Sequence, residues 1–360
     1  MVRDSRKIKM REDYFTSDKF KQDVDKLINK INLSDEFYLI PIKRGRNNRV
    51  FCVNIKGWGK ALLKAYFKHP KDPRDRLRNE FSFSNFAWDK GLRGLHKPYA
   101  CDCENNLGLY QFIEGRKITP DEVNREFVDQ ALAFFIELNK HKDSPEAKKL
   151  PNASEACFSI NGHLDTVKRR IDRLKMINGS SEVDREAISF VDNELLGGWN
   201  GVFLNAKQLI DDYDLDPNEE IHFFDRCLSP SDFGFHNAIV DKERRLFFVD
   251  FEYAGWDDPS KMICDFFCQP EVPVSLDYYG SFIEAVFRAD LSEKNIKKTN
   301  LLLPVYRIKW CCIMLNEFLR YDSERRNFSQ ADVNIEKRKS EQLEKARVYL
   351  RSATKEKILF

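Results

Sequence analysis

Strand-type segments are gathered near the start of this chain, and that order is the strongest constraint on its fold. Three short runs rich in aromatic and aliphatic residues follow one another: FYLIPI at 37–42, RVFCVNI at 49–55 and KALLKAYF at 60–67. LGLYQFIEG at 107–115 is a further predicted strand that runs into a turn. Strands separated by short turns pair antiparallel. The sequence therefore predicts an α+β fold with a small antiparallel sheet first and a larger, mostly helical part after it.

Apolar residues at helical spacing predict the remaining elements. One amphipathic helix at 15–33 precedes the strands, and another at 72–91 ends at Gly91. Later helices are predicted at 120–141, 161–177, 183–196, 200–213, 259–268, 275–290, 294–322 and 330–352. The last is crowded with charged residues, so we expect a terminal helix with one face in solvent, or alternatively a partner-binding helix. No long linker interrupts the pattern, which predicts two packed lobes at 1–113 and 114–360.

Composition excludes several classes of protein. Hydrophobic residues make up 42% of the 360 residues, which argues against disorder. Sixty basic residues balance 58 acidic ones, so nothing points to nonspecific nucleic-acid binding. The N-terminal MVRDSRKIKMREDYF has no apolar signal-peptide core, and no apolar run approaches the roughly 18 residues that cross a bilayer. We expect a cytoplasmic chain without a membrane segment, and its oligomeric state stays open.

The nine cysteines do not form the paired spacing of a zinc site. Cys101 and Cys103 are two residues apart, and Cys264 and Cys268 are one helical turn apart. A zinc site from these four is the alternative to reduced, mostly buried thiols, which is the interpretation we favour.

The stretch LSPSDFGFHNAIVDKERRLFFVDFEYAGWDDP interrupts the helical part with a predicted hairpin, NAIVD and RLFFVDF. Asp232 lies in the loop before it, Asn237 at its start and Asp250 at the end of its returning strand. An Asp in a turn commonly caps backbone amides, but a carboxylate between Val and Phe is costly unless it is paired or bound to a metal. The hairpin brings Asn237 and Asp250 to one end of the sheet, and two such oxygen ligands suit Mg²⁺.

The order DFGFHN, apolar hairpin, VDFEYAGWDDP resembles the catalytic and metal-binding segments of the aminoglycoside phosphotransferase and choline kinase family. The resemblance covers roughly residues 37–270 and implies the two-lobed protein-kinase-like fold. It implies transfer of the γ-phosphoryl group of ATP to a small-molecule hydroxyl, with Mg²⁺. By position, Asp232 would be the catalytic base, and Asn237 and Asp250 the metal ligands.

The first lobe carries residues that match the same family. A kinase holds the α- and β-phosphates with a strand lysine that a helical carboxylate orients. Lys64 lies in the predicted strand ALLKAYF, and Glu80 lies sixteen residues later in a predicted helix. RGRNNRVFCV occupies the position of the phosphate-covering turn, where Gly45, Asn47 and Asn48 are expected to offer tight backbone geometry and amides. LYQFIEG resembles the hinge between the lobes in that family, which implies that backbone groups at Gln111 to Ile113 would bind adenine.

Two departures from the family pattern leave an alternative function open. Pro230 stands where the family commonly has His, and the phosphate-covering turn has one glycine. His236 is close to the loop but out of register with that His. A nucleotide-binding pseudokinase or scaffold without turnover is therefore the alternative to an active kinase. A protein kinase is disfavoured, because Asp250 is followed by Phe-Glu instead of Phe-Gly and no APE segment follows.

The acceptor is the least determined part of the prediction: an amino alcohol, an aminoglycoside or a sugar. The acidic run at 210–220, with Asp257 and Asp258, is able to attract a cation, although such a run is more often a solvated loop. Trp199 and Trp256 are candidate surfaces for a quaternary ammonium or a sugar ring, although Trp in a helical lobe is usually core.

Overall fold

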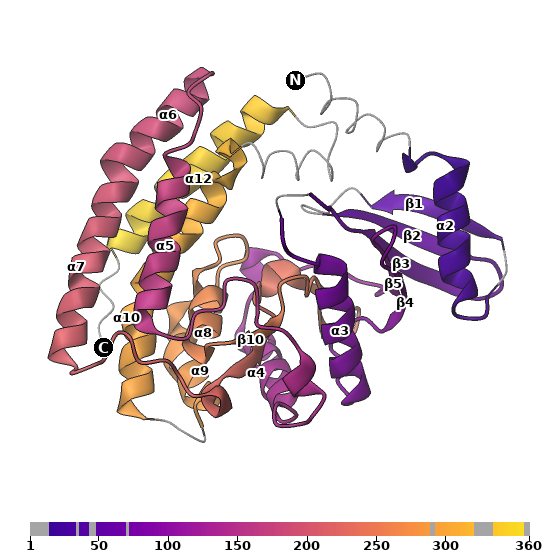
Figure 1. Cartoon of the computed structure of the whole chain (residues 1–360), viewed down its shortest axis with the longest axis horizontal. Coiled ribbons are helices and arrows are strands. Elements are labelled where there is room, and N and C mark those ends of the chain that lie inside the picture. The colour runs from indigo at the N-terminus through magenta and orange to yellow at the C-terminus, as the bar shows by residue number, and fades with distance from the viewer. Residues whose placement is uncertain are drawn as a thin grey trace.

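A computed structural model describes residues 14–33, 36–42, 48–69, 72–288, 292–319 and 334–355. The sheet and its two helices form one lobe, and the helices labelled α4 to α12 form a larger second lobe beside it (Figure 1). This arrangement confirms the predicted α+β, two-lobed fold.

The first lobe is built on a five-stranded antiparallel sheet in the order β1-β2-β3-β5-β4. Its strands are β1 (Phe37–Ile42), β2 (Arg49–Ile55), β3 (Gly59–Ala65), β4 (Pro98–Asp102) and β5 (Leu107–Gln111). The sequence pattern missed β4. This strand lies at the edge of the sheet and begins with Pro98. A proline is tolerated there because the outer side of an edge strand has no neighbouring strand to receive a backbone hydrogen bond.

Two helices complete the first lobe. α2 (Asp18–Asn29) packs Phe20, Val24, Leu27 and Ile28 against the sheet to form a small apolar core. It begins later than predicted because the side chain of Ser17 accepts a hydrogen bond from the backbone of Phe20 and so caps the helix. α3 (Arg76–Asp89) contacts β4 and β5.

The second lobe is helical, as predicted. Its helices are α4 (Arg125–Asn139), α5 (Ile160–Leu174), α6 (Glu182–Phe190), α7 (Leu196–Asp212), α8 (Pro259–Cys268), α9 (Tyr279–Val286), α10 (Glu293–Met314) and α12 (Ile335–Lys355). α10 is the central helix, in contact with α5, α7, α8 and α12. The two helices predicted across 183–213 are one continuous run, because a π-helical turn at Val191–Leu195 joins α6 to α7.

The charged terminal helix has one face in solvent and one face buried, as predicted. α12 buries Leu343, Ala346 and Leu350 in the large apolar core and packs on α10 (Figure 1). Its neighbour α10 ends earlier than the predicted 294–322, at Met314, and a short 3₁₀ turn at Leu315–Phe318 follows.

Short strands position the loops that face the first lobe. The predicted hairpin is present as β8 (Ala238–Val240) and β9 (Leu246–Phe248), and β6 (Arg116–Lys117) pairs with β8. A second pair, β7 (Cys227–Ser229) with β10 (Gly255–Asp257), was not predicted, because three-residue strands have no measurable periodicity. No helix in the described parts of the chain is long and apolar enough to span a lipid bilayer.

Candidate active site

A cleft of about 1760 Å³ receives side chains from both lobes. Lys64 of β3 lines it from the first lobe. Asp232, Asn237 and Asp250 line it from the loops on either side of the β8–β9 hairpin. Four side chains singled out from the sequence, which lie up to 186 residues apart along the chain, are thus brought to one cavity.

Lys64 makes an ion pair between the two lobes. Its Nζ lies 2.9 and 2.6 Å from the two carboxylate oxygens of Glu80, and 2.8 Å from Oδ1 of Asp250. Burial lowers the pKa of Lys64, but Asp250 and Glu80 outweigh burial and hold that pKa above its ordinary value. The ammonium is therefore charged and fixed by one carboxylate from each lobe.

Glu80 is held by its own buried surroundings. Tyr66 donates from its hydroxyl to Oε2 of Glu80 over 2.7 Å, and His96 Nε2 lies 3.5 Å from Oε1. Burial raises the pKa of Glu80, yet Lys64 and His96 outweigh it and lower the pKa to about 2. Glu80 is thus an ionised anchor for Lys64 and is not a group that exchanges protons near neutral pH.

Asp250 differs from Glu80 because it opens toward the cleft, with 29% of its side chain exposed. Its backbone has a positive φ of 73°, an uncommon conformation for a residue other than glycine, which turns the chain sharply after β9. Burial and the negative charges of Glu252 and Glu80 raise its pKa to about 6, against the lowering effect of Lys64. Strained backbone and a perturbed pKa in a cleft are features that cluster at functional sites.

Asp232 sits in a loop that orders its carboxylate from two sides. His236 Nε2 lies 3.0 Å from Oδ1, and the amide nitrogen of Asn237 donates to Oδ2 over 3.1 Å. Burial raises the pKa of Asp232, but His236 and Asn237 outweigh it and lower the pKa to about 2. The carboxylate is therefore ionised and oriented toward the cleft. His236 was noted in the sequence only as out of register, and spacing alone did not indicate its contact with Asp232.

The donor set fits Mg²⁺ held jointly with a nucleotide. The amide nitrogen of Asn237 is used by Asp232, which leaves its oxygen as the available ligand atom. Asp250 supplies a carboxylate on the same cleft wall. Among the described residues no three His, Cys, Asp or Glu side chains gather around a metal position. Two protein oxygens suit an ion that completes its shell with water and phosphate oxygens.

The phosphate-covering turn is only partly visible. Gly45 and Asn47 lie outside the described residues, so their expected role stays a prediction. Asn48 is buried, and its side chain bridges the lobes: Nδ2 donates to Glu252 over 2.8 Å, and Oδ1 accepts from the backbone N–H of Phe67 over 3.3 Å. The side-chain amide of Asn48 is thus engaged by protein groups, and only its backbone remains for a phosphate.

Glu252 is a site residue that the sequence pattern did not single out. It is fully buried two residues after Asp250, and Arg76 Nε lies 3.8 Å from its Oε1. The signal was present in the sequence as a glutamate between Phe251 and Tyr253, because a carboxylate in apolar surroundings needs a partner.

The segment joining the lobes presents free backbone at Ile113. Gln111 and Ile113 both line the cleft. The backbone N–H of Gln111 donates to the carbonyl of Lys97 over 2.8 Å, so this group is not free for adenine. Within the described part of the chain the N–H of Ile113 has no such partner.

Several features proposed for the acceptor lie elsewhere. Trp199 and Trp256 are buried in the core of the second lobe. Asp257 pairs with Lys261, and Asp258 with His163 and Lys298. Neither these residues nor the 210–220 run is among the described residues that line the cleft.

The four cysteines considered as zinc ligands do not come together at one site. Cys101 and Cys103 lie in or beside β4 of the first lobe, whereas Cys264 and Cys268 are buried in α8, with sulfurs near carbonyls of α10. The two pairs belong to different lobes.

Comparisons with known proteins agree with this architecture. No family model and no curated protein sequence matches the chain. Among solved structures, a spectinomycin phosphotransferase in complex with ADP and spectinomycin is 12% identical. That match covers 91% of this chain and 98% of the other, with a TM-score of 0.58. The chain has the fold of the aminoglycoside phosphotransferases and choline kinases.

Two further structures from different organisms show the same fold. An ethanolamine kinase from Plasmodium vivax is 16% identical over 89% of this chain and 81% of its own, with a TM-score of 0.56. A choline kinase from Streptococcus pneumoniae is 15% identical over 92% of this chain and 99% of its own, with a TM-score of 0.54. Each of these matches covers about nine tenths of this chain.

Proposed function

We propose that this protein is an ATP-dependent phosphotransferase that acts on the hydroxyl group of a small molecule. The observation that carries the proposal is the ion pair between Lys64 of the first lobe and Asp250 of the second, in the same cleft as Asp232 and Asn237. A strand lysine, a helical glutamate and a metal-binding carboxylate are the parts that position a nucleotide in kinases.

In this proposal each residue has one task. Residues 1–113 form the nucleotide-binding lobe, in which Lys64 holds phosphate oxygens and Ile113 meets the adenine. Asn237 and Asp250 hold Mg²⁺, which neutralises phosphate charge when bound. Residues 114–360 form the catalytic lobe, whose Asp232 orients the acceptor hydroxyl. The proposed place of action is the cytoplasm.

The reaction balances with these groups. The acceptor oxygen forms a bond to the γ-phosphorus, and the bond from that phosphorus to the bridging oxygen breaks to release ADP. The hydroxyl proton passes to Asp232. Because the pKa of Asp232 is low, its main contribution is to orient the hydroxyl, and the proton leaves late, once the new bond has formed.

The test is phosphate transfer by the purified chain from γ-labelled ATP with Mg²⁺ to choline, ethanolamine, aminoglycosides and sugars. We expect transfer to at least one acceptor class, and a loss on the order of 10²–10⁴-fold in Asp232→Ala. Asp192→Ala is the matched control, because Asp192 is an exposed carboxylate on the π-helical turn outside the cleft.

The second candidate is a nucleotide-binding scaffold, and Pro230 favours it. The backbone N–H of Asp232 donates to the carbonyl of Pro230 over 2.9 Å, so the loop has its own geometry in place of the one a histidine would organise. Mg²⁺-dependent ATP binding without transfer to any acceptor in the panel would establish the scaffold and refute the kinase.

A further inference from the structure

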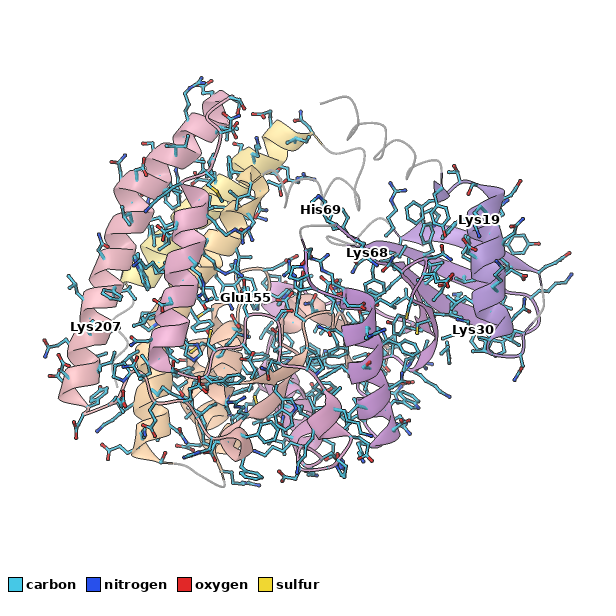
Figure 2. The ribbon with its side chains drawn as sticks, viewed as in Figure 1. Lys19, Lys30, Lys68, His69, Glu155 and Lys207 are labelled. Carbon is cyan, nitrogen blue, oxygen red and sulfur yellow. The ribbon has the colours of Figure 1, made fainter. Side chains whose placement is uncertain are left out.

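The part of the cleft beyond Asp232 has a distinctive charge arrangement. We call it the inner end and define it by five lining residues: Glu155, Arg170, Asp265, Lys309 and Trp310. They come from the turn before α5, from α5 itself, from α8 and from α10. Figure 2 shows Glu155 on the side of the second lobe that faces the first, whereas Lys207 lies on the outer helix α7.

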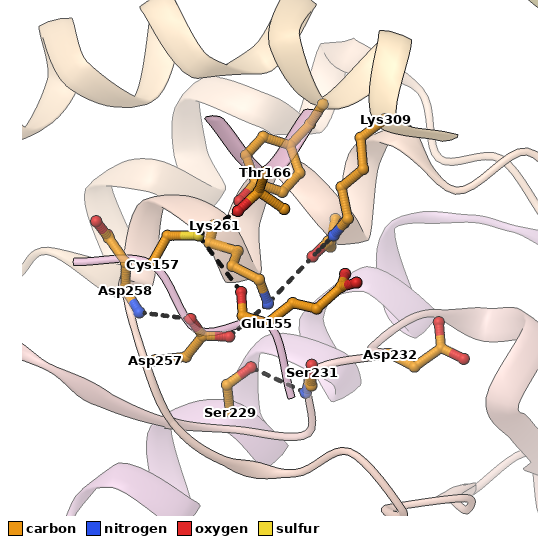
Figure 3. Close-up of polar contacts among 12 residues, drawn as sticks. Glu155, Cys157, Thr166, Ser229, Ser231, Asp232, Asp257, Asp258, Lys261 and Lys309 are labelled. Atoms are coloured by element: carbon orange, nitrogen blue, oxygen red, sulfur yellow. Dashed lines mark hydrogen bonds and ion pairs between the residues drawn. The ribbon is translucent and has the colours of Figure 1, made fainter. Parts of the chain in front are cut away.

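Both carboxylates of the inner end are already neutralised. Glu155 contacts the guanidinium of Arg170. Asp265 receives Lys309 Nζ at 2.8 and 2.9 Å and the indole N–H of Trp310 at 3.1 Å, and Lys261 Nζ lies 3.5 Å away. Figure 3 shows the side chain of Glu155 in the region between Lys309 and Asp232, and all three residues line the cleft. Lys309 and Arg170 are largely buried, which keeps their charges close to any bound acceptor.

A cationic acceptor is poorly served by this arrangement. A quaternary ammonium or an amino sugar is held by carboxylates that lack a cation or by a cage of aromatic rings. Here each carboxylate has a cation in contact, and Trp310 is the one aromatic residue of the inner end. A further cation there would lose hydration without gaining an unpaired carboxylate from the inner end.

A neutral polyol fits the same groups well. A carboxylate paired with a cation keeps unused lone pairs. Vicinal hydroxyl groups can donate to Glu155 or Asp265 without adding charge. Trp310 contributes apolar surface beside them, as sites for small ligands require.

We infer that the acceptor is a neutral, polyhydroxylated sugar or cyclitol, bound between the Glu155–Arg170 and Asp265–Lys309 pairs. This inference rests on the proposed kinase function and narrows it. Its hydroxyl nearest Asp232 is the one that takes the phosphoryl group. Charge is what distinguishes a neutral acceptor from an aminated one, because an ammonium group on the same ring would find both carboxylates already paired with Arg170 and Lys309.

The experiment compares matched acceptors that differ by one amino group. Glucose is tested against glucosamine, galactose against galactosamine, and myo-inositol against choline, each with Mg²⁺ and γ-labelled ATP. We expect transfer to a neutral member, with kcat/KM at least tenfold above that of its aminated partner. Preferential phosphorylation of an amino sugar, choline or an aminoglycoside would refute the neutral acceptor and leave the kinase function standing. Transfer to no compound, with nucleotide still bound, would count against both.

A variant tests whether the lysine sets the preference. Lys309→Met removes one cation, while Lys261 and Trp310 still contact Asp265. We expect the ratio of aminated to neutral acceptor use to rise about tenfold, with the Kd for Mg²⁺–ATP unchanged. Lys207→Met on α7 is the matched control and should leave the ratio as it is. Glu341 and Glu344 of α12 also line the cleft, so an unchanged ratio in Lys309→Met would mean that they select the acceptor and would overturn the role of the inner end.

Discussion

Two buried charge clusters of this protein have opposite balances. Between the lobes, one ammonium, Lys64, serves two carboxylates, Glu80 and Asp250. Inside the second lobe the ratio is reversed, because the single carboxylate of Asp258 receives His163 at 3.2 Å and Lys298 at 3.0 Å. The first cluster opens to the cleft through Asp250, whose side chain is 29% exposed, whereas that of Asp258 is 1% exposed.

The pKa values follow from this difference. Burial and nearby carboxylates raise the pKa of Asp250, while the cations around Asp258 outweigh burial and lower its pKa. A surplus of negative charge facing a cleft is suited to receive a metal ion, whereas a fully paired carboxylate is suited to hold helices together. Burial of a charge by itself therefore does not mark a functional residue, and the local balance of charge does.

The largest expected effect is on phosphate transfer, and it comes from substituting the carboxylate of the interlobe cluster, Asp250. In the proposed kinase, Asp250→Asn removes a ligand of Mg²⁺ worth several kcal/mol in the transition state and should lower phosphate transfer on the order of 10³-fold. Its free energy of unfolding should stay the same or rise, since the folded state disfavours the charged form of Asp250. Transfer assays and urea denaturation of the same preparation measure both quantities.

Asp258→Asn is expected to lower the stability of the protein and to leave phosphate transfer nearly unchanged. It leaves His163 and Lys298 buried without their carboxylate, which should cost about 3–5 kcal/mol of the free energy of unfolding. The transfer rate of the fraction that remains folded should stay near that of the wild type. If Asp258→Asn abolished transfer while stability was kept, the assignment of the two clusters would be wrong.

The next effect is a loss of stability at high pH. Burial lowers the pKa of His163, but Asp258 and Cys157 outweigh it and raise the pKa to about 9, above the ordinary 6.5. The stabilisation is complete below pH 6.5 and is lost as the pH rises through 9. We expect a fall of about 3 kcal/mol in the free energy of unfolding between pH 6.5 and 9.5. Urea denaturation at both pH values measures it, and His163→Gln should remove most of the change.

The sequence predicted those parts of the molecule that repeat a local pattern. Strands β1 and β2 were located from their aromatic and β-branched runs, and β3 with a shift at its ends. The sequence separation of Lys64 and Glu80 was enough to expect their contact, because it places one on a strand and the other on the next helix. Strands of three residues, such as β7, were missed because nothing local distinguishes them from a loop.

Contacts between distant segments could not be predicted in the same way. Asn48 and Glu252 meet across 204 positions, and His236 reaches Asp232 only because of the loop conformation. The acceptor features suggested by the acidic run and by Trp199 failed for the same reason: composition near a motif does not tell which way a helix faces. The inner end uses Glu155 and Lys309, which no local pattern marked.

The smallest effect concerns the pH at which Mg²⁺ strengthens nucleotide binding. In the proposed function Asp250 must be ionised to hold Mg²⁺, and its pKa is about 6. We therefore expect the Mg²⁺-dependent gain in ATP affinity to fall about tenfold between pH 7 and pH 5. The ratio of the Kd values for ATP without and with Mg²⁺ at each pH measures this gain. The Asp250→Asn variant is the control, because protonation of ATP itself changes the ratio equally in both proteins. The variant should show no further change from titration of the protein.

Glu252→Gln sharpens this last expectation. The negative charge of Glu252 contributes to the raised pKa of Asp250, so its removal should move the midpoint to lower pH. Glutamine can still accept the hydrogen bond from Asn48, which keeps the lobes joined. A midpoint that stayed in place would mean that the charge of Glu252 does not contribute to the raised pKa of Asp250. In that case the surplus of carboxylates would not be what distinguishes the interlobe cluster from the one around Asp258.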